Sequence, residues 1–229
     1  MSGHPRPMEP SLILSKKGQV QPVEDSPCIQ EPLGANSHGV SYVNPFLAAE
    51  RRLGEFERDP GFLCLRIVTP GKWGGRPANC SSPLKAVQTG YVIVLHTAGG
   101  SCKTGAECNQ QMTNIQHYHM NNKGWCNIAY NFLIGEDGKV YEGRGWNTEG
   151  AHTYGYNDIS LGIAFMGDFT GRSPNAAAWI ALKHLLHYAV ENGYLSSDYL
   201  LMAHGDVSNT ISPGQPIRKV LKTWPHYKH

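Results

Sequence analysis

Two histidines stand at the ends of apolar segments. His96 closes the nearly continuous apolar run of residues 91–96, and His204 follows the apolar segment LLMA. In α/β proteins the carboxyl ends of neighbouring strands meet at one edge of the sheet, and functional groups gather there. Histidines at such an edge can bind a metal, move a proton or donate a hydrogen bond. A lone histidine is more often a satisfied structural residue, so position alone leaves both uses open.

The usual motifs of hydrolytic chemistry are missing. A catalytic zinc takes three protein ligands and an open position, and no third ligand is evident beside the two histidines. The sequence contains no HExxH segment, no CxxC pair and no paired-carboxylate motif. Ser212 does not lie in a GxSxG motif, so we do not expect a nucleophilic serine.

Four further polar side chains lie on or beside the expected elements: His119, Lys123, Tyr130 and His152. The first two are four residues apart and therefore share a helix face, for which a solvated surface is the simpler interpretation. Cys102 and Cys108 bound a short loop that a disulfide could close, the alternative being two free thiols.

The elements that must position these groups alternate along the chain. Apolar runs and a turn at residues 135–138 predict strands at residues 91–96, 129–134, 139–142, 161–166 and 200–203. Helices are predicted over residues 104–121 and 214–222. A third helix begins after a Ser173 cap, with Pro174 at its first position, and ends at Gly193. Its apolar stripe is Ala178, Ala181, Leu182, Leu185, Leu186 and Ala189. This alternation predicts an α/β fold with helices covering a sheet.

Composition narrows the class of protein. The 229 residues are 40% hydrophobic and carry a net charge of +2, which excludes wholesale disorder and gives no argument for nucleic acid. No apolar stretch approaches the roughly 18–20 residues of a transmembrane helix. Six cysteines suggest an oxidising compartment.

The N-terminal quarter differs from the rest of the chain. Residues 1–60 are polar, rich in Pro and Gly and not periodic, so we expect a mostly disordered extension with one short helix at residues 44–58. The first residues lack the apolar core of about 7–15 residues that a secretory signal needs. Either a leader is missing from this chain or export follows another route. The folded domain is expected at residues 64–229.

Four segments together resemble the peptidoglycan recognition proteins, and in particular their vertebrate secreted members. They are VIVLHTAGGSCKTGAEC, GWCNIAYNFLIGEDGKVYEGRGWNTEGAH, NDISLGIAFMGDF and AHGDVSNTISPG with the closing TWPHYKH. The resemblance implies a central mixed β-sheet flanked by helices, a fold shared with phage zinc amidases. It also implies a secreted protein of innate immunity, able to arrest or kill bacteria. Its partners would be bacterial peptidoglycan and muramyl peptides.

The resemblance also implies a broken zinc site. Amidase members carry ligands at the positions of Leu95, His204 and Ser212, and only the histidine is retained. Leucine cannot coordinate a metal, and a neutral hydroxyl is a poor substitute for a thiolate. Tyr130 and Thr210 match the assisting positions of active relatives. If the alignment slips by one residue, His96 becomes a ligand, but Ser212 still leaves the site incomplete. We therefore expect no metal, no cofactor and no amidase activity.

The ligand-contacting positions of the family are better retained. By resemblance they fall on His96, Thr97, His119, Lys123, Tyr130, His152 and Asn157. Gly124-Trp125 matches the pair that accompanies a preference for diaminopimelate-type stem peptides, whereas Asn-Phe accompanies a preference for lysine-type peptides. A glycine leaves room for the extra carboxylate of diaminopimelate.

The resemblance also pairs most of the cysteines. It implies the disulfides Cys102–Cys108 and Cys80–Cys126, while Tyr188 stands where Cys64 would find its usual partner. Cys64 is left to pair with Cys28, to bridge two chains in a homo- or heterodimer, or to remain free.

Two other functions compete with non-enzymatic peptidoglycan binding. One is a zinc-dependent N-acetylmuramoyl-L-alanine amidase that uses His204, His96 and an unexpected third ligand. The other is an interaction or regulatory protein that has lost ligand binding. The seven polar residues retained at ligand-contacting positions argue against the second, because drift would tend to remove them.

Overall fold

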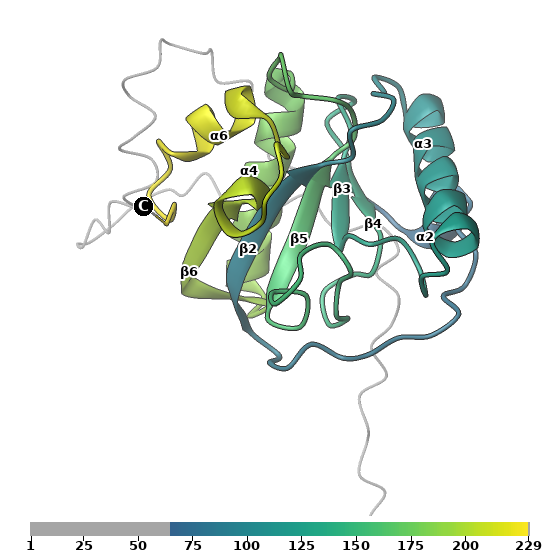
Figure 1. The fold of residues 1–229 in the computed structure, drawn as a ribbon, viewed down its shortest axis with the longest axis horizontal. Helices are drawn as coiled ribbons and strands as arrows, with labels where there is room; N and C mark the ends of the chain where they lie inside the picture. The colour runs from purple at the N-terminus through teal and green to yellow at the C-terminus, as the bar shows by residue number, and fades with distance from the viewer. Residues whose placement is uncertain (1–64, 229) are drawn as a thin grey trace, which may run out of the picture.

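The computed structural model describes residues 65–228 and contains one six-stranded mixed sheet with helices against both faces (Figure 1). The strand order is β1-β4-β3-β5-β2-β6, and every neighbouring pair is parallel except the antiparallel hairpin β3–β4. The predicted mixed sheet flanked by helices is therefore confirmed. The predictions for residues 1–60, for the helix at 44–58 and for Cys28 and Cys64 lie outside the described residues.

The strands and helices have the following bounds. The strands are β1 Ile67–Val68, β2 Thr89–His96, β3 Phe132–Ile134, β4 Val140–Glu142, β5 Ser160–Phe165 and β6 Leu195–Ala203. The helices are α2 Pro70–Trp73, α3 Gly105–His117, the π-helical turn η2 Tyr118–Asn122, α4 Ala176–Glu191, α5 His204–Val207 and α6 Gln215–Leu221. The sequence gives no sign of β1, α2 and α5, which are too short to show a period.

Strand β2 is buried on both faces, which explains its unbroken apolar run. Val92 and Val94 pack in one core with α4 and α6, whereas Ile93 and Leu95 pack in a second core with α2 and α3. In Figure 1 these two helix pairs lie on opposite sides of the sheet.

The predicted apolar stripe of α4 is confirmed, because all six of its residues are buried. The predicted cap at Ser173 is wrong. Asn175 caps the helix, because its side chain accepts a hydrogen bond from the amide of Ala178 at 2.9 Å. Ser173 instead accepts a hydrogen bond from the indole of Trp179 at 3.0 Å. Gly193 adopts a left-handed φ of 72° just after the helix, as a stop residue does.

The helix predicted over residues 104–121 is present, but its last turn has a different geometry. Thr104 caps α3 in a capping box with Glu107. The chain then widens into the π-helical turn η2, which holds His119. Such turns are rare and often mark functional sites.

Three predicted strands match within one or two residues, and the other two begin farther from the expected residue. Strand β3 begins at Phe132 rather than at residue 129, because the amide of Ala129 donates to the His119 ring and not to a neighbouring strand. Strand β6 begins at Leu195 rather than at residue 200 and includes the polar Ser196–Asp198 stretch of a sheet edge.

Both predicted disulfides are confirmed, Cys80–Cys126 and Cys102–Cys108, each with a Cα–Cα distance of 5.0 Å. The first ties the segment after α2 to the loop after η2. The second ties the loop after β2 to α3. Within residues 65–228, no helix has both the length and the apolar character needed to cross a bilayer.

Candidate functional site

A groove of about 320 Å³ opens where β2 ends and where β6 passes into α5. It gathers nine of the predicted residues: Leu95, His96, Thr97, His119, Trp125, Tyr130, His152, His204 and Ser212. Lys123, Gly124 and Asn157 do not line it. The predicted convergence of His96 and His204 at one sheet edge is therefore observed, together with two further histidines from a helical turn and a loop.

Backbone amides fix the tautomers of two groove histidines. The amide of Phe169 donates to His96 Nδ1 at 3.1 Å, and the amide of Ala129 donates to His119 Nδ1 at 3.1 Å. An amide N–H can only donate, so Nδ1 must be the acceptor and the proton of each neutral ring resides on Nε2. Both histidines therefore keep an Nε2–H donor for a ligand.

His152 is clamped between two glycines. A Cβ added at Gly162 would lie 2.3 Å from its Cδ2 atom, and a Cβ at Gly150 would lie 2.2 Å from the same atom. Asn157 Oδ1 accepts hydrogen bonds from the amides of His152 and Thr153, both at 2.8 Å. Asn157 thus holds the loop that carries the ring. His152 Nε2 is buried and has no hydrogen-bond partner within the described residues.

All four groove histidines are held in the neutral form. Burial lowers the pKa of His119 to about 4 and that of His152 to about 3, and the nearby Arg144 guanidinium contributes to both shifts. Burial also lowers the pKa of His96, against an opposing effect of Asp168, and that of His204. At neutral pH the groove therefore offers directional donors and acceptors rather than imidazolium charge.

Aromatic rings form one wall of the groove. The ring of His119 lies 4.9 Å from that of Trp125 and 5.8 Å from that of Tyr130, measured between centroids. Burial raises the pKa of Tyr130 to about 12, so its hydroxyl remains protonated. Trp125 is 37% exposed and presents an apolar face suited to a sugar ring or a stem peptide.

Lys123 and Gly124 lie beside this wall, where η2 ends. The Lys123 ammonium lies 5.5 Å above the centroid of the Tyr118 ring, and its charge helps to lower the pKa of His119. Gly124 has a left-handed φ of +69°, and no atom lies within 4 Å of a Cβ built there. The predicted open space at Gly124 is therefore present in the structure.

The three positions implied for zinc lie in different surroundings. Leu95 is 2% exposed and belongs to the core beneath α3. Ser212 Oγ accepts a hydrogen bond from the His96 amide at 3.3 Å. His204 Nδ1 is buried without a partner among residues 65–228. In that same part of the chain, no group of three or more His, Cys, Asp or Glu side chains is arranged to hold a metal ion.

Two charged residues of the site carry no signal in the sequence. Arg144 donates to the carbonyls of Ile128 and Glu149, both at 2.7 Å, and so lies close enough to depress the pKa of His119 and His152. Asp168 lines the groove, and its Oδ1 lies 3.9 Å from His96 Nδ1. Both sit in irregular segments, where no periodicity points to them. The groove also includes Ala98, Ala129, Ala151, Thr170, Thr210 and Ile211.

Comparisons with known proteins define the class of this domain. The family model described as N-acetylmuramoyl-L-alanine amidase matches residues 86–215. Peptidoglycan recognition protein 3 of Mus musculus is 47% identical over 190 residues, which cover 82% of this chain and 54% of that protein. Peptidoglycan recognition protein 1 of Bos indicus is 49% identical over 166 residues, which cover 72% of this chain and 87% of that protein.

A solved structure agrees with these relatives. Human PGRP-IBETAC, in complex with glycosamyl muramyl pentapeptide, has a TM-score of 0.69 and 46% identity, covering 72% of this chain and all of that one. The chain belongs to the peptidoglycan recognition protein family, and its domain matches the amidase family model. It spans about half the length of the mouse relative.

Proposed function

We propose that this protein is a secreted pattern-recognition protein of innate immunity that binds bacterial peptidoglycan in the groove without cleaving it. The observation that carries the proposal is the convergence of neutral histidines, two of them with fixed Nε2–H donors, beside an aromatic wall. Muramyl peptides carry sugar hydroxyls, amides and a lactyl carbonyl, which match such a set of directional donors. Human PGRP-IBETAC, a relative of the same fold, was solved with such a ligand.

The residues at the implied zinc positions argue against the amidase alternative. Leu95 and Ser212 occupy two of the three positions where active relatives hold zinc, and Ser212 Oγ is already engaged by a backbone amide. Tyr130 then acts as a ligand contact, not as a catalytic group. Contacts to the ligand are assigned to His96, Thr97, His119, Lys123, Tyr130, His152 and Trp125, and Asn157 acts by positioning His152.

The open space at Gly124 supports a preference for diaminopimelate-type stem peptides, whose extra carboxylate needs room beside the backbone. The two disulfides support an extracellular location. Arrest or killing of bacteria is proposed as the consequence of this binding.

Co-sedimentation with insoluble peptidoglycan tests the proposal. The pure protein should pellet with diaminopimelate-type material in the absence of zinc, pellet less with lysine-type material, and release no muropeptide in either case. Release of peptide on addition of zinc would show zinc-dependent amidase activity instead. Protein that stays in the supernatant with both polymers would favour an interaction protein that has lost ligand binding.

A further inference from the structure

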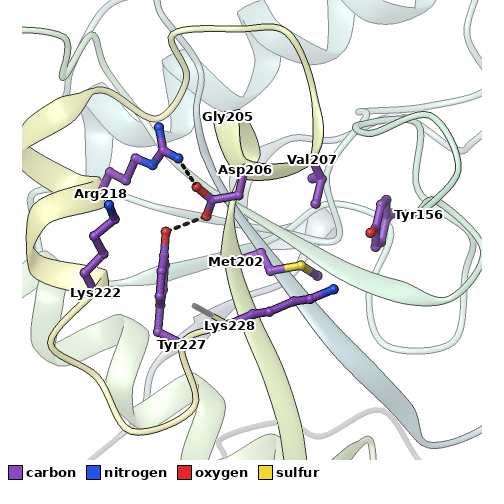
Figure 2. A pocket seen from close by; sticks show the side chains of 9 residues that line it. All are labelled: Tyr156, Met202, Gly205, Asp206, Val207, Arg218, Lys222, Tyr227 and Lys228. Atoms are coloured by element: carbon purple, nitrogen blue, oxygen red, sulfur yellow. Dashed lines mark hydrogen bonds and ion pairs between the residues drawn. The ribbon is translucent and has the colours of Figure 1, made fainter.

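A second pocket lies on the other side of α5 from the groove. It has a volume of about 570 Å³ and is built by β6, α5, α6, the C-terminal segment and Tyr156 (Figure 2). Helix α5 is the shared wall, since His204 lines the groove while Gly205, Asp206 and Val207 line the pocket. None of the residues proposed to bind peptidoglycan lines this pocket.

The carboxylate of the pocket is fully engaged by the protein itself. Asp206 Oδ1 pairs with Arg218 Nη2 at 2.5 Å. Asp206 Oδ2 accepts hydrogen bonds from the Tyr227 hydroxyl at 2.5 Å and from the Ala203 amide at 2.7 Å. Figure 2 shows this carboxylate between the Arg218 and Tyr227 side chains. Its charge is therefore compensated, and it fastens α5 to α6 and to the C-terminal segment.

Two lysines add positive charge that nothing in the pocket compensates. Lys222 and Lys228 are exposed, and neither ammonium has an ion pair or a hydrogen bond within residues 65–228. Figure 2 shows the Lys228 ammonium reaching past Met202 toward Tyr156, while Lys222 lies beside Arg218. Since Asp206 balances Arg218, the pocket keeps an excess of two positive charges.

The opposite wall of the pocket is uncharged and indicates what kind of group it could bind. Tyr156, Met202 and Val207 lie on the side away from Arg218 and Lys222 (Figure 2). A phenol ring beside an ammonium suits a sugar, which has both apolar faces and hydroxyl groups. The volume lies within the range of about 300–1,000 Å³ that small-molecule sites occupy.

We propose that this pocket binds a phosphorylated saccharide, with the phosphate held at the Lys222 end of the pocket and the sugar against Tyr156 and the Lys228 ammonium. Phosphate is favoured over carboxylate for a specific reason. Arginine is the residue that recognises a carboxylate with two parallel hydrogen bonds, and Arg218 is already committed to Asp206. Lys222 acts as a point charge, which suits a phosphate that carries more charge and has more acceptor oxygens.

Calorimetric titration of the full chain with glucose 6-phosphate tests this proposal. Glucose and glucuronate serve as the neutral and carboxylate comparators. We expect glucose 6-phosphate to bind at least about tenfold more tightly than either. The double variant Lys222→Gln/Lys228→Gln should lose at least about tenfold in affinity, since the charge that holds the phosphate and the charge beside the sugar are both removed.

The matched control is Lys219→Gln, which removes an exposed charge from α6, shortly before Lys222, at a position that does not line the pocket. It should bind glucose 6-phosphate like the wild type. Equal affinities of the double variant and the control would overturn the proposal, as would equal affinity for glucose 6-phosphate and glucuronate. Inorganic phosphate binding as tightly as the sugar phosphate would refute the part played by the saccharide. The double variant should sediment normally with peptidoglycan, so this test fails or succeeds independently of the groove.

Discussion

The groove and the second pocket share α5 but differ in how they present charge. On one side, burial keeps four histidines neutral, and backbone amides decide which nitrogen of His96 and His119 carries the proton. On the other side, Lys222 and Lys228 are exposed and uncompensated. One short helix therefore separates a surface suited to selection by hydrogen-bond geometry from a surface suited to selection by charge.

The largest expected effect comes from Gly162→Ala, which should weaken binding in the groove and leave binding in the second pocket unchanged. The new methyl group would lie 2.3 Å from His152 Cδ2, so the ring must leave its clamp. We expect peptidoglycan affinity to fall at least about tenfold, or about 1.4 kcal/mol. Glucose 6-phosphate affinity should not change. Sedimentation measures the affinity for peptidoglycan, and calorimetry measures the affinity for glucose 6-phosphate.

Gly90→Ala is the control for that substitution. Gly90 lies in β2, and no atom lies within 4 Å of a Cβ built there. Peptidoglycan binding by this variant should match the wild type. If Gly162→Ala also bound normally, His152 would not be a ligand contact.

Acid should destabilise the protein through the groove. In the folded state the pKa of His119 is lowered to about 4, so the unfolded chain, with an ordinary value of about 6.5, binds more protons between these two limits. The contribution of His119 to stability is therefore fully present above a pH of about 6.5, and it is lost as the pH falls toward 4. The expected loss from this residue is roughly 1–3 kcal/mol.

Urea unfolding at several pH values measures this slope. His119→Gln should flatten the dependence of the unfolding free energy on pH. The comparison is His187→Gln, which removes an exposed histidine paired with Glu191 on α4 and should change this dependence less. An equal effect of the two substitutions would show that burial in the groove is not the cause.

Added salt should weaken binding in the second pocket more than binding in the groove. Between about 50 mM and about 500 mM NaCl, exposed charges become strongly screened. Glucose 6-phosphate affinity should fall about fivefold, whereas the affinity for a soluble muramyl peptide should change by less than about twofold. Similar salt dependence at both sites would remove the distinction drawn between them.

A change of specificity is expected at the end of the aromatic wall. Gly124→Asn with Trp125→Phe fills the open space beside η2, and asparagine tolerates the left-handed φ of +69°. The ratio of affinities for diaminopimelate-type and lysine-type peptides should shift toward lysine by about three- to tenfold. Gly155→Asn, also at a left-handed glycine in open space, should leave the ratio unchanged. An unchanged ratio in the double variant would contradict the role given to Gly124.

Periodic elements could be predicted from the sequence, and irregular ones could not. The apolar stripe of α4 and the run of β2 follow from burial alone, and both were located correctly. The cap of α4 was misplaced because two polar residues compete near its start, and Asn175 also donates hydrogen bonds to Glu136 at 2.7 and 3.1 Å.

The groove depends on long-range contacts that have no local pattern. The π-helical turn at His119 and the approach of Arg144 arise only when distant segments pack together. The second pocket forms because the C-terminal segment returns to β6 through the bridge between Leu201 and Tyr227. Family resemblance named most groove residues, whereas nothing in the sequence indicated this pocket.

The most direct test of the central claim is nuclear magnetic resonance of the protein with ¹⁵N-labelled histidines, titrated with a soluble diaminopimelate-type muramyl peptide at neutral pH. Before addition, the spectrum should show neutral His96 and His119 rings with the proton on Nε2. On addition, the Nε2 resonances of His96, His119 and His152 should shift together, while that of His187 stays in place. Groove histidines that are charged at neutral pH, or that do not respond to the peptide, would contradict the account.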